Sequence, residues 1–264
     1  MGLYVTILGC GTSSGVPRIG NDWGQCDPRN PKNRRTRVSL LVQSDTTTIL
    51  VDTSPDMREQ LLAADVIGID AVLWTHDHAD HSHGIDDLRQ VYHYRHRALQ
   101  RADPIPGYAR AETLKLLRRR FAYAFDGGEG YMPIIAGQDL DAADRVTIGD
   151  IAIGCVDMPH GPIWSTGFRF ENDGKSVGYA TDFHEVTPNM DALFSGLDLW
   201  VVDALRETPH PTHSHLSQTL DAVERLKPGK AFLTHMDQSM DYDRLCATLP
   251  PHVRPAHDGL KLAL

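Results

Sequence analysis

The stretch from Thr75 to His81 constrains this chain more than any other, because its last six positions hold three histidines and two aspartates. An apolar run, residues 71–74, precedes it and has the character of a buried strand. If that strand ends at Thr75, His76 and His78 lie two residues apart and project to the same side. Both imidazoles can then bind one metal ion, so the spacing HxHxDH predicts a metal site rather than an exposed polar loop.

Further candidate ligands follow strand-like runs in the same way. Asp80 and His81 come after the first run, while His160, Asp182 and His235 lie past three others. Layered α/β folds gather their ligands outside the carboxyl ends of strands, so this recurrence argues against coincidence. His76, His78 and His160 can hold one ion, Asp80, His81 and His235 the other, and Asp182 can bridge them. Two ions are a hydrolytic arrangement, and these donors suit Zn, Mn or Fe.

The overall charge restricts the class of partner. The 264 residues carry a formal net charge of -9, which argues against a protein that grips long nucleic acid over its whole surface. A site with two divalent ions and two carboxylates would still be positive locally and would attract phosphate. We therefore expect no long nucleic acid, whereas the charge is compatible with a small phosphorylated substrate.

Cysteine usage and hydropathy indicate the compartment. Cys10, Cys26, Cys155 and Cys246 are far apart and form no CxxC pair, so a disulfide framework is not expected. The N-terminus runs into a strand-like segment without a basic leader, and no apolar run is long enough to span a bilayer. These features predict a cytoplasmic protein that does not contact a membrane.

Apolar patterning predicts a single α/β domain over residues 1–264, without internal repeats or linkers. Strands are expected at residues 3–8, 38–42, 47–51, 71–74, 145–148, 151–156, 166–170, 177–181, 199–202 and 231–234. Helices are expected at residues 84–101, 111–125 and 216–226, where apolar side chains recur on one face. The segment 171–174, Glu-Asn-Asp-Gly, has the composition of a hairpin turn.

The residues after the third predicted strand carry two signals. Ser54-Pro55-Asp56 has the chemistry of a helix start, with a cap, a proline at the first position and an acid in the first turn. Asp52, at the strand end, either orients a nearby metal ligand or forms the turn itself, and the residues are compatible with both.

Residues 16–37 lack an apolar period and predict a long loop. Its basic residues, Lys32, Arg34, Arg35 and Arg37, are mostly expected to be solvated or paired. One arginine could instead bind a second phosphate of the substrate, because a planar guanidinium suits bidentate contact.

Several stretches together carry a family resemblance. They are Gly9–Ser13, Thr75–Arg89 with the HxHxDH motif, His210–His213 and Leu233–Met236. With them, the chain resembles the metallo-β-lactamase fold superfamily. Within it, the chain is similar to the cyclic phosphodiesterases related to the carbon–phosphorus lyase pathway enzyme, which opens 5-phosphoribosyl 1,2-cyclic phosphate. The resemblance implies a four-layer αββα sandwich with a helical insertion after the HxHxDH motif.

The resemblance also implies roles for individual residues. The metal-ligand roles fall on His76, His78, Asp80, His81, His160, Asp182 and His235, the residues named above. Asp52 takes the place of the superfamily's motif aspartate. A hydroxide shared by the two ions is expected to attack phosphorus, with Asp80 also at the catalytic centre.

The His-Pro-Thr-His segment supplies the expected general acid. His213 resembles the additional active-site histidine of the phosphodiesterase branch, and it is preferred over its neighbours His210 and His215. Arg37 and His215 are expected to contact the substrate. The resemblance further implies a homodimer.

One departure and three alternatives stay open. The pathway enzyme holds a structural zinc with a cysteine cluster in its early loop, whereas this loop contains Cys26 alone, which puts that zinc and the exact substrate in doubt. The alternatives are a tRNA 3′-end processing endonuclease, a thioester hydrolase of the glyoxalase type, and a non-catalytic metal- and nucleotide-binding protein.

Overall fold

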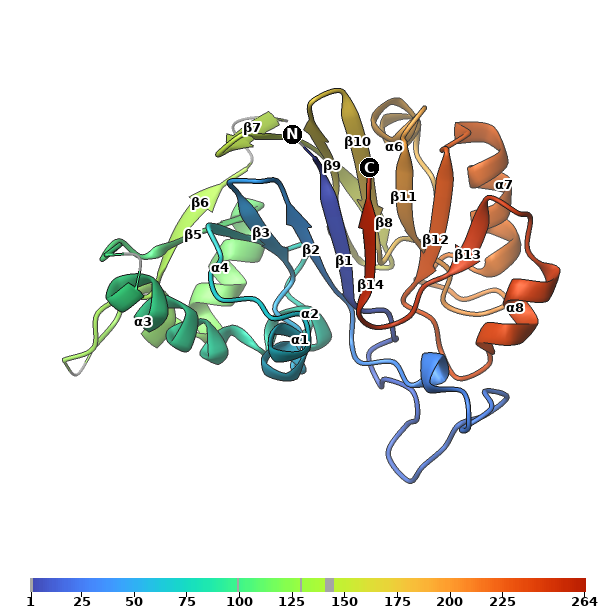
Figure 1. Cartoon of the computed structure of the whole chain (residues 1–264), viewed down its shortest axis with the longest axis horizontal. Helices are drawn as coiled ribbons and strands as arrows, with labels where there is room; N and C mark the ends of the chain where they lie inside the picture. Colours follow the sequence, from blue (N-terminus) through green and yellow to red (C-terminus); the bar gives the residue numbers. More distant parts are fainter. Residues whose placement is uncertain (1, 99, 129, 141–144) are drawn as a thin grey trace.

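Two seven-stranded β-sheets pack face to face, and helices cover both outer faces (Figure 1). This arrangement is seen in a computed structural model that describes residues 2–98, 100–128, 130–140 and 145–264. The four layers confirm the predicted αββα sandwich of the α/β class. Within the described residues, no helix is both long enough and apolar enough to cross a bilayer.

Each sheet is antiparallel at one end and parallel at the other. The first has the order β14 (Leu260–Ala263), β1 (Tyr4–Gly9), β2 (Ser39–Gln43), β3 (Thr48–Val51), β4 (Ala71–Leu73), β5 (Ile105–Ala109) and β6 (Ile135–Asp139). The second has the order β13 (Val253–Pro255), β12 (Lys230–Thr234), β11 (Leu199–Asp203), β10 (Lys175–Ala180), β9 (Ile163–Asn172), β8 (Ile151–His160) and β7 (Arg145–Ile148). The parallel strands β3 to β6 and β10 to β13 place several carboxyl ends at one end of the sandwich, where α/β folds form their sites.

The apolar runs form strands that are buried on both faces. In β2, Leu40 and Val42 belong to the cluster between the two sheets, whereas Leu41 belongs to the cluster under the helices. This division follows from the two-residue period of a strand. Because both faces are covered, both need apolar side chains, which explains the continuous rather than alternating pattern.

Helices complete the outer layers. The first sheet is covered by α1 (Met57–Ala63), α3 (Leu88–Ala98), α4 (Ala111–Arg120) and α5 (Ala122–Phe125), and the second by α6 (Pro188–Phe194), α7 (Leu216–Leu226) and α8 (Tyr242–Thr248). The predicted amphipathic helix at 216–226 is confirmed as α7, which buries Ala222, Val223 and Leu226. The short elements are α2 (Ala79–Ser82) and the 3-10 turns Pro31–Asn33 and Ile85–Asp87.

The predicted helical insertion also contributes two strands. β5 and β6 extend the first sheet in parallel beyond β4. Sequence patterning missed β5 because Pro106 and Gly107 interrupt its apolar run. A Cβ at Gly107 would lie 2.6 Å from the Trp74 ring, so the strand needs glycine to pass that ring. Also missed were β6, β13, β14, α6 and α8.

Some predicted boundaries were wrong. The helix expected at 84–101 is a 3-10 turn followed by α3, which ends at Ala98, and Leu99 lies outside the described residues. The helix expected at 111–125 breaks at Phe121, whose φ and ψ are -124° and 40°. The helix expected to start after Ser54 begins at Met57, although Ser54 Oγ accepts a hydrogen bond from the Asp56 N–H as a cap would, and the Asp56 carboxylate contacts Arg37.

The hairpin of β8 and β9 is longer than predicted. Its pairing continues to His160 opposite Ile163, so His160 is the last residue of a strand and not part of the loop after it. The hairpin turn predicted between β9 and β10 is confirmed, with Asp173 and Gly174 both at positive φ.

Candidate metal centre

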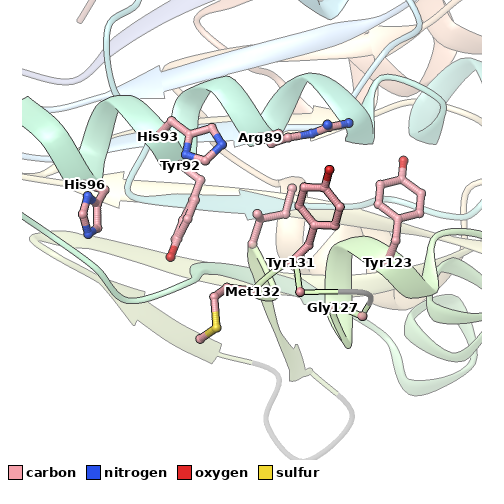
Figure 2. A pocket seen from close by; sticks show the side chains of 11 residues that line it. Arg89, Tyr92, His93, His96, Tyr123, Gly127, Tyr131 and Met132 are labelled. Carbon is pink, nitrogen blue, oxygen red and sulfur yellow. The ribbon is translucent and has the colours of Figure 1, made fainter.

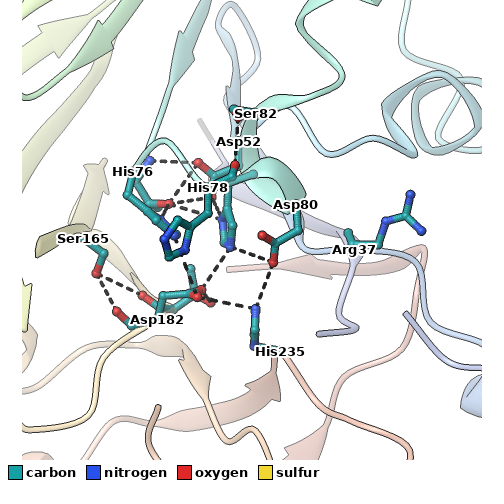
Figure 3. Close-up of polar contacts among 12 residues, drawn as sticks. Arg37, Asp52, His76, His78, Asp80, Ser82, Ser165, Asp182 and His235 are labelled. Carbon is teal, nitrogen blue, oxygen red and sulfur yellow. Dashed lines mark hydrogen bonds and ion pairs between the residues drawn. The ribbon is translucent and has the colours of Figure 1, made fainter. Parts of the chain in front are cut away.

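The seven predicted donors converge at the carboxyl ends of strands from both sheets. Figure 3 labels five of them, His76, His78, Asp80, Asp182 and His235. The segment after β4 supplies His76, His78, Asp80 and His81, and the second sheet supplies His160 from β8, Asp182 after β10 and His235 after β12. The structure therefore brings together every residue that the sequence nominated as a metal ligand. No single sheet contains the whole site.

The donor atoms form the two triads expected from the sequence. The donor atoms of His76, His78 and His160 lie within 4.8 Å of one another, and so do those of Asp80, His81 and His235. Asp182 lies between the triads, with Oδ2 3.2 Å from His81 Nε2 and Oδ1 3.6 Å from His160 Nε2. Its carboxylate would be within reach of ions held by either triad.

Buried hydrogen bonds fix which imidazole nitrogen faces the cluster. His81 Nδ1 donates to Asp52 Oδ2 at 2.7 Å, and the backbone N–H of Thr75 donates to Asp52 Oδ1 at 2.8 Å. Thr75 Oγ1 in turn lies 3.0 Å from His76 Nδ1. With Nδ1 engaged, Nε2 of both histidines is left for a metal. Asp52 is placed to orient His81 and belongs to neither donor triad.

His160 is oriented by the loop that carries His213. Its Nδ1 donates to the backbone carbonyl of Thr212 at 2.8 Å. Gly161, which follows in the hairpin turn with φ 58°, passes close to the same residue, since a Cβ there would lie 2.6 Å from Thr212 Cγ2. The glycine lets the hairpin and the loop pack together, which ties the position of His160 to that loop.

The cluster passes a simple test for metal binding. His76 Nε2, His81 Nε2 and both ring nitrogens of His235 are buried, and within the described part of the chain none of them makes a hydrogen bond, although carboxylate oxygens lie 3.2 to 4.0 Å from the three Nε2 atoms. A buried polar atom without a partner costs about 1–3 kcal/mol, a cost that metal coordination would remove. Imidazole and carboxylate together are the donors that Zn, Mn and Fe accept. The residues present therefore fit divalent metal ions.

Electrostatics of the metal-free cluster agree with this fit. Burial would raise the pKa of Asp182, but the imidazoles of His235 and His81 outweigh it and hold that pKa well below its usual range. Burial would lower the pKa of His235, yet the Asp182 and Asp80 carboxylates raise it to about 9. Without metal, the buried carboxylates therefore favour the protonated, positively charged form of the neighbouring histidines. Bound divalent ions would supply that positive charge instead.

Three site residues have a left-handed backbone. Asp52, Asp182 and His235 have φ values of 61°, 60° and 58°. Non-glycine residues rarely adopt this conformation, which costs about 1–3 kcal/mol at such positions. Asp52 and His235 follow a strand directly and Asp182 follows one after Thr181, so the left-handed turn redirects the chain close to the point where each strand ends.

The cluster opens into a cavity of about 260 Å³. Its walls include Ser13, Pro162 and Ile163 as well as His213, the expected general acid. His213 Nδ1 donates to the buried Oδ2 of Asp203 at 3.0 Å, which leaves its Nε2 available to a substrate.

Asp203 is the site residue that sequence reasoning missed. It is the last residue of β11, is fully buried, and also accepts a hydrogen bond from the backbone N–H of Asp182 at 3.1 Å. A signal was present, because Asp203 follows the apolar run at 199–202 just as Asp182 follows the run at 177–181.

The predicted substrate contacts Arg37 and His215 lie outside the lining of this cavity. Arg37 Nε pairs with Asp56 Oδ2 at 2.9 Å, and Figure 3 shows its guanidinium directed away from the cluster. His215 is the N-cap residue of α7. Arg35, expected to be solvated or to bind phosphate, is instead buried and donates to two backbone carbonyls in the 237–240 loop.

Arg120 fastens the insertion to the metal-binding segment. Its Nη2 lies 2.5 Å from the Asp77 carboxylate, and its Nη1 donates to the Asp77 backbone carbonyl. Asp77 lies between His76 and His78, so this contact helps to fix the position of both imidazoles. A run of three arginines such as Arg118-Arg119-Arg120 is usually a solvated helix face, but Arg120 instead pairs with the metal-binding segment.

Comparison with known proteins places this geometry in a family. Residues 47–236 match the model of the beta-lactamase superfamily domain. A solved structure of a diphosphatase from the PhnP family is 35% identical, with a TM-score of 0.90, and the match covers 100% of this chain and 98% of that one. This bears out the resemblance inferred from the motifs.

Two curated relatives match more weakly. The octanoyltransferase of Porphyromonas gingivalis is 29% identical over 97% of this chain, and ribonuclease Z of a Bradyrhizobium species is 31% identical over 53%. The matches cover 50% and 46% of those proteins, so the chain spans about half the length of either relative.

The superfamily model covers well over half of the chain, and the fold and donor set agree with it. The chain therefore belongs to the beta-lactamase superfamily, and its fold and clustered His and Asp side chains are those of a metal-dependent hydrolase.

Proposed function

We propose that this chain hydrolyses phosphodiesters, and that its preferred substrate is small and cyclic, such as a ribose cyclic phosphate. The observation that carries the proposal is the Asp203–His213 pair at the mouth of the metal cluster, with 3.0 Å between the carboxylate oxygen and Nδ1. The ester oxygen that leaves phosphorus as an alkoxide needs a proton, and an imidazolium whose Nδ1–H is held by a carboxylate can donate it from Nε2. Hydrolysis of a thioester would not require such a group.

The cavity supports a small substrate. Its volume of about 260 Å³ lies below the usual range for drug-sized ligands, about 300–1,000 Å³. Two divalent ions, Zn or Mn with Fe as a further option, would be held by the two triads and Asp182. They would act as Lewis acids toward a phosphoryl oxygen and lower the pKa of water.

The side chains of this protein have separate tasks in the reaction. Water adds to phosphorus while the bond from phosphorus to the ribose oxygen breaks, giving a phosphomonoester and a free hydroxyl. As an imidazolium, His213 gives its Nε2 proton to the departing oxygen, while Asp203 holds Nδ1–H, orients the ring and stabilises its charge until that proton leaves. Asp80 borders the cavity, where its carboxylate can accept a hydrogen bond from the attacking water.

The comparisons support phosphoryl chemistry. The PhnP-family neighbour is described as a diphosphatase, so a diphosphate belongs among the test substrates. Similarity to ribonuclease Z favours a second candidate, the endonucleolytic cleavage of precursor tRNA, which also breaks a phosphodiester. A homodimer stays part of the proposal, to be tested by light scattering.

The deciding experiment compares two leaving groups. Protein loaded separately with Mn and Zn is assayed with a ribose cyclic phosphate and with bis(p-nitrophenyl) phosphate. Because p-nitrophenolate leaves without a proton, His213→Ala should lower kcat about 10²- to 10⁴-fold on the cyclic substrate and much less on the aryl ester. Metal content of the variant should stay at two ions.

His210→Ala is the matched control, since the His210 ring lies 5.1 Å from that of His213 but outside the cavity lining. Equal losses on both substrates would remove His213 from the role of acid. Turnover of precursor tRNA with none on the cyclic substrate would favour the second candidate. If the protein binds both ions but turns over none of these substrates, the result would favour a non-catalytic metal- and nucleotide-binding protein.

A further inference from the structure

A second cavity lies on the insertion that follows the HxHxDH motif. It has a volume of about 830 Å³ and lies between α3 and the segment that leads from α5 toward β6 (Figure 2). It shares no lining residue with the cavity at the metal centre. Its size is in the range of established ligand pockets. We call it the insertion groove.

One wall of the insertion groove is a stripe along α3. Arg89, Tyr92, His93 and His96 line it, at the spacing i, i+3, i+4 and i+7 that places side chains on one face of a helix. On a helix that packs against the core, such a stripe would be aliphatic. Here it consists of one phenol, two imidazoles and a guanidinium, and Figure 2 shows these side chains arrayed along the helix.

The opposite wall exposes apolar and aromatic side chains. Tyr123 is 47% exposed, and Tyr131 and Met132 are each 71% exposed. In Figure 2 the two tyrosine rings stand toward α3 across the groove. Rings this exposed gain little from packing within the chain, so they are free to stack against a planar ligand.

Charge is distributed unevenly along the chain, and the groove lies in the basic part. Residues 88–120 contain nine Arg or Lys and two Asp or Glu, a formal +7 within a chain whose total is -9. Seven of these nine cations pair with carboxylates of the described residues, among them Arg89 with Asp86 at 2.5 Å. Arg97 is exposed one residue beyond His96. The described residues that line the groove include one guanidinium, two imidazoles and no carboxylate, so with its aromatic rings the lining is complementary to an anion that carries planar bases.

We propose that the insertion groove binds single-stranded nucleic acid. Bases would stack on the tyrosine rings, and backbone phosphates would contact Arg89 and the neighbouring basic side chains. The expectation that no long nucleic acid binds came from the net charge of the whole chain, which averages over this segment. The proposal does not depend on the hydrolytic activity, because it concerns a separate cavity.

The test measures binding to metal-depleted protein, so that hydrolysis cannot interfere. A fluorescein-labelled thymidine hexamer is titrated with wild type, Tyr131→Ala and Arg89→Ala, and anisotropy is followed at 50, 100 and 200 mM KCl. Tyr131→Ala should weaken binding roughly five- to hundredfold through loss of a stacking platform. Arg89→Ala should reduce the slope of log K against log salt by about 0.7, the share of one phosphate contact.

Tyr4→Ala is the matched control, since Tyr4 is a 43% exposed tyrosine on β1, at the other end of the first sheet. Unchanged binding by Tyr4→Ala beside weakened binding by Tyr131→Ala would support the proposal. Absence of saturable binding by wild type, or equal effects of the two tyrosine variants, would overturn it. So would light scattering in which Tyr131→Ala dissociates a dimer that does not bind the hexamer, because the groove would then be an interface between copies.

Discussion

Arg120 offers the sharpest test of how the insertion supports the metal centre. Its side chain is 41% exposed, whereas that of Asp77 is only 11% exposed, so Arg120→Ala leaves a nearly buried carboxylate without its cation. Exposed ion pairs contribute about 0–1 kcal/mol, but an unsatisfied buried acceptor costs about 1–3 kcal/mol. We take about 1–2 kcal/mol as the free energy that metal binding must then spend to order the segment from His76 to His78. This corresponds to roughly 5- to 30-fold weaker metal binding.

The measurement is a Mn titration of metal-depleted protein by calorimetry. The ion held by His76, His78 and His160 should be weakened more than the second ion. Arg120→Lys should be intermediate, because an ammonium keeps the charge but cannot reach both the carboxylate and the carbonyl of Asp77 with one planar group. Arg119→Ala is the control, since Arg119 is exposed on the same helix. If Arg120→Ala and Arg119→Ala bind both ions equally well, the supporting role of Arg120 is refuted.

Three further predictions follow from the site. Asp203→Asn should lower kcat on a cyclic phosphate about 10²- to 10³-fold at unchanged metal content, measured by steady-state kinetics with metal analysis, and an unchanged kcat would contradict the role of Asp203. Asp52→Ala should weaken metal binding about 10- to 100-fold, which competition with a chelating dye would detect or exclude. In metal-free protein, the His235 pKa of about 9 exceeds its unfolded value, so His235 stabilises the fold fully below pH 6.5 and this contribution, about 3 kcal/mol, is lost as pH rises through 9. Urea unfolding from pH 6.5 to 9.5 should show the decline in wild type and a flatter profile in His235→Gln.

The metal ligands were predictable because their signals are local. HxHxDH packs four donors into six residues, and His160, Asp182 and His235 all lie close to the ends of apolar runs. A strand that ends at the rim of a sheet delivers its next polar residue to that rim, so pattern and position agree. Asp203 escaped because it is the last residue of its strand, where an acid is easily counted as part of a turn.

Other features depend on contacts that no local pattern encodes. The role of Arg120 requires knowing that it meets Asp77, 43 residues earlier in the chain. Arg35 looked like a solvated residue in a polar loop, yet two backbone carbonyls of a distant segment bury it. β5 was hidden because the residues that let it pass Trp74, Pro106 and Gly107, are those that usually argue against a strand.

The division of ligands between the two sheets has a consequence beyond the site itself. The first sheet provides His76, His78, Asp80 and His81, and the second provides His160, Asp182 and His235, so bound ions would join the two layers across their shared core. Coupling free energies are reciprocal. If bound ions stabilise the packing of the two sheets, then well-packed sheets raise the affinity for the ions by the same free energy. Loss of packing at a residue such as Phe168, deep between the sheets, would then appear in the laboratory as a defect in metal retention before any loss of fold was visible.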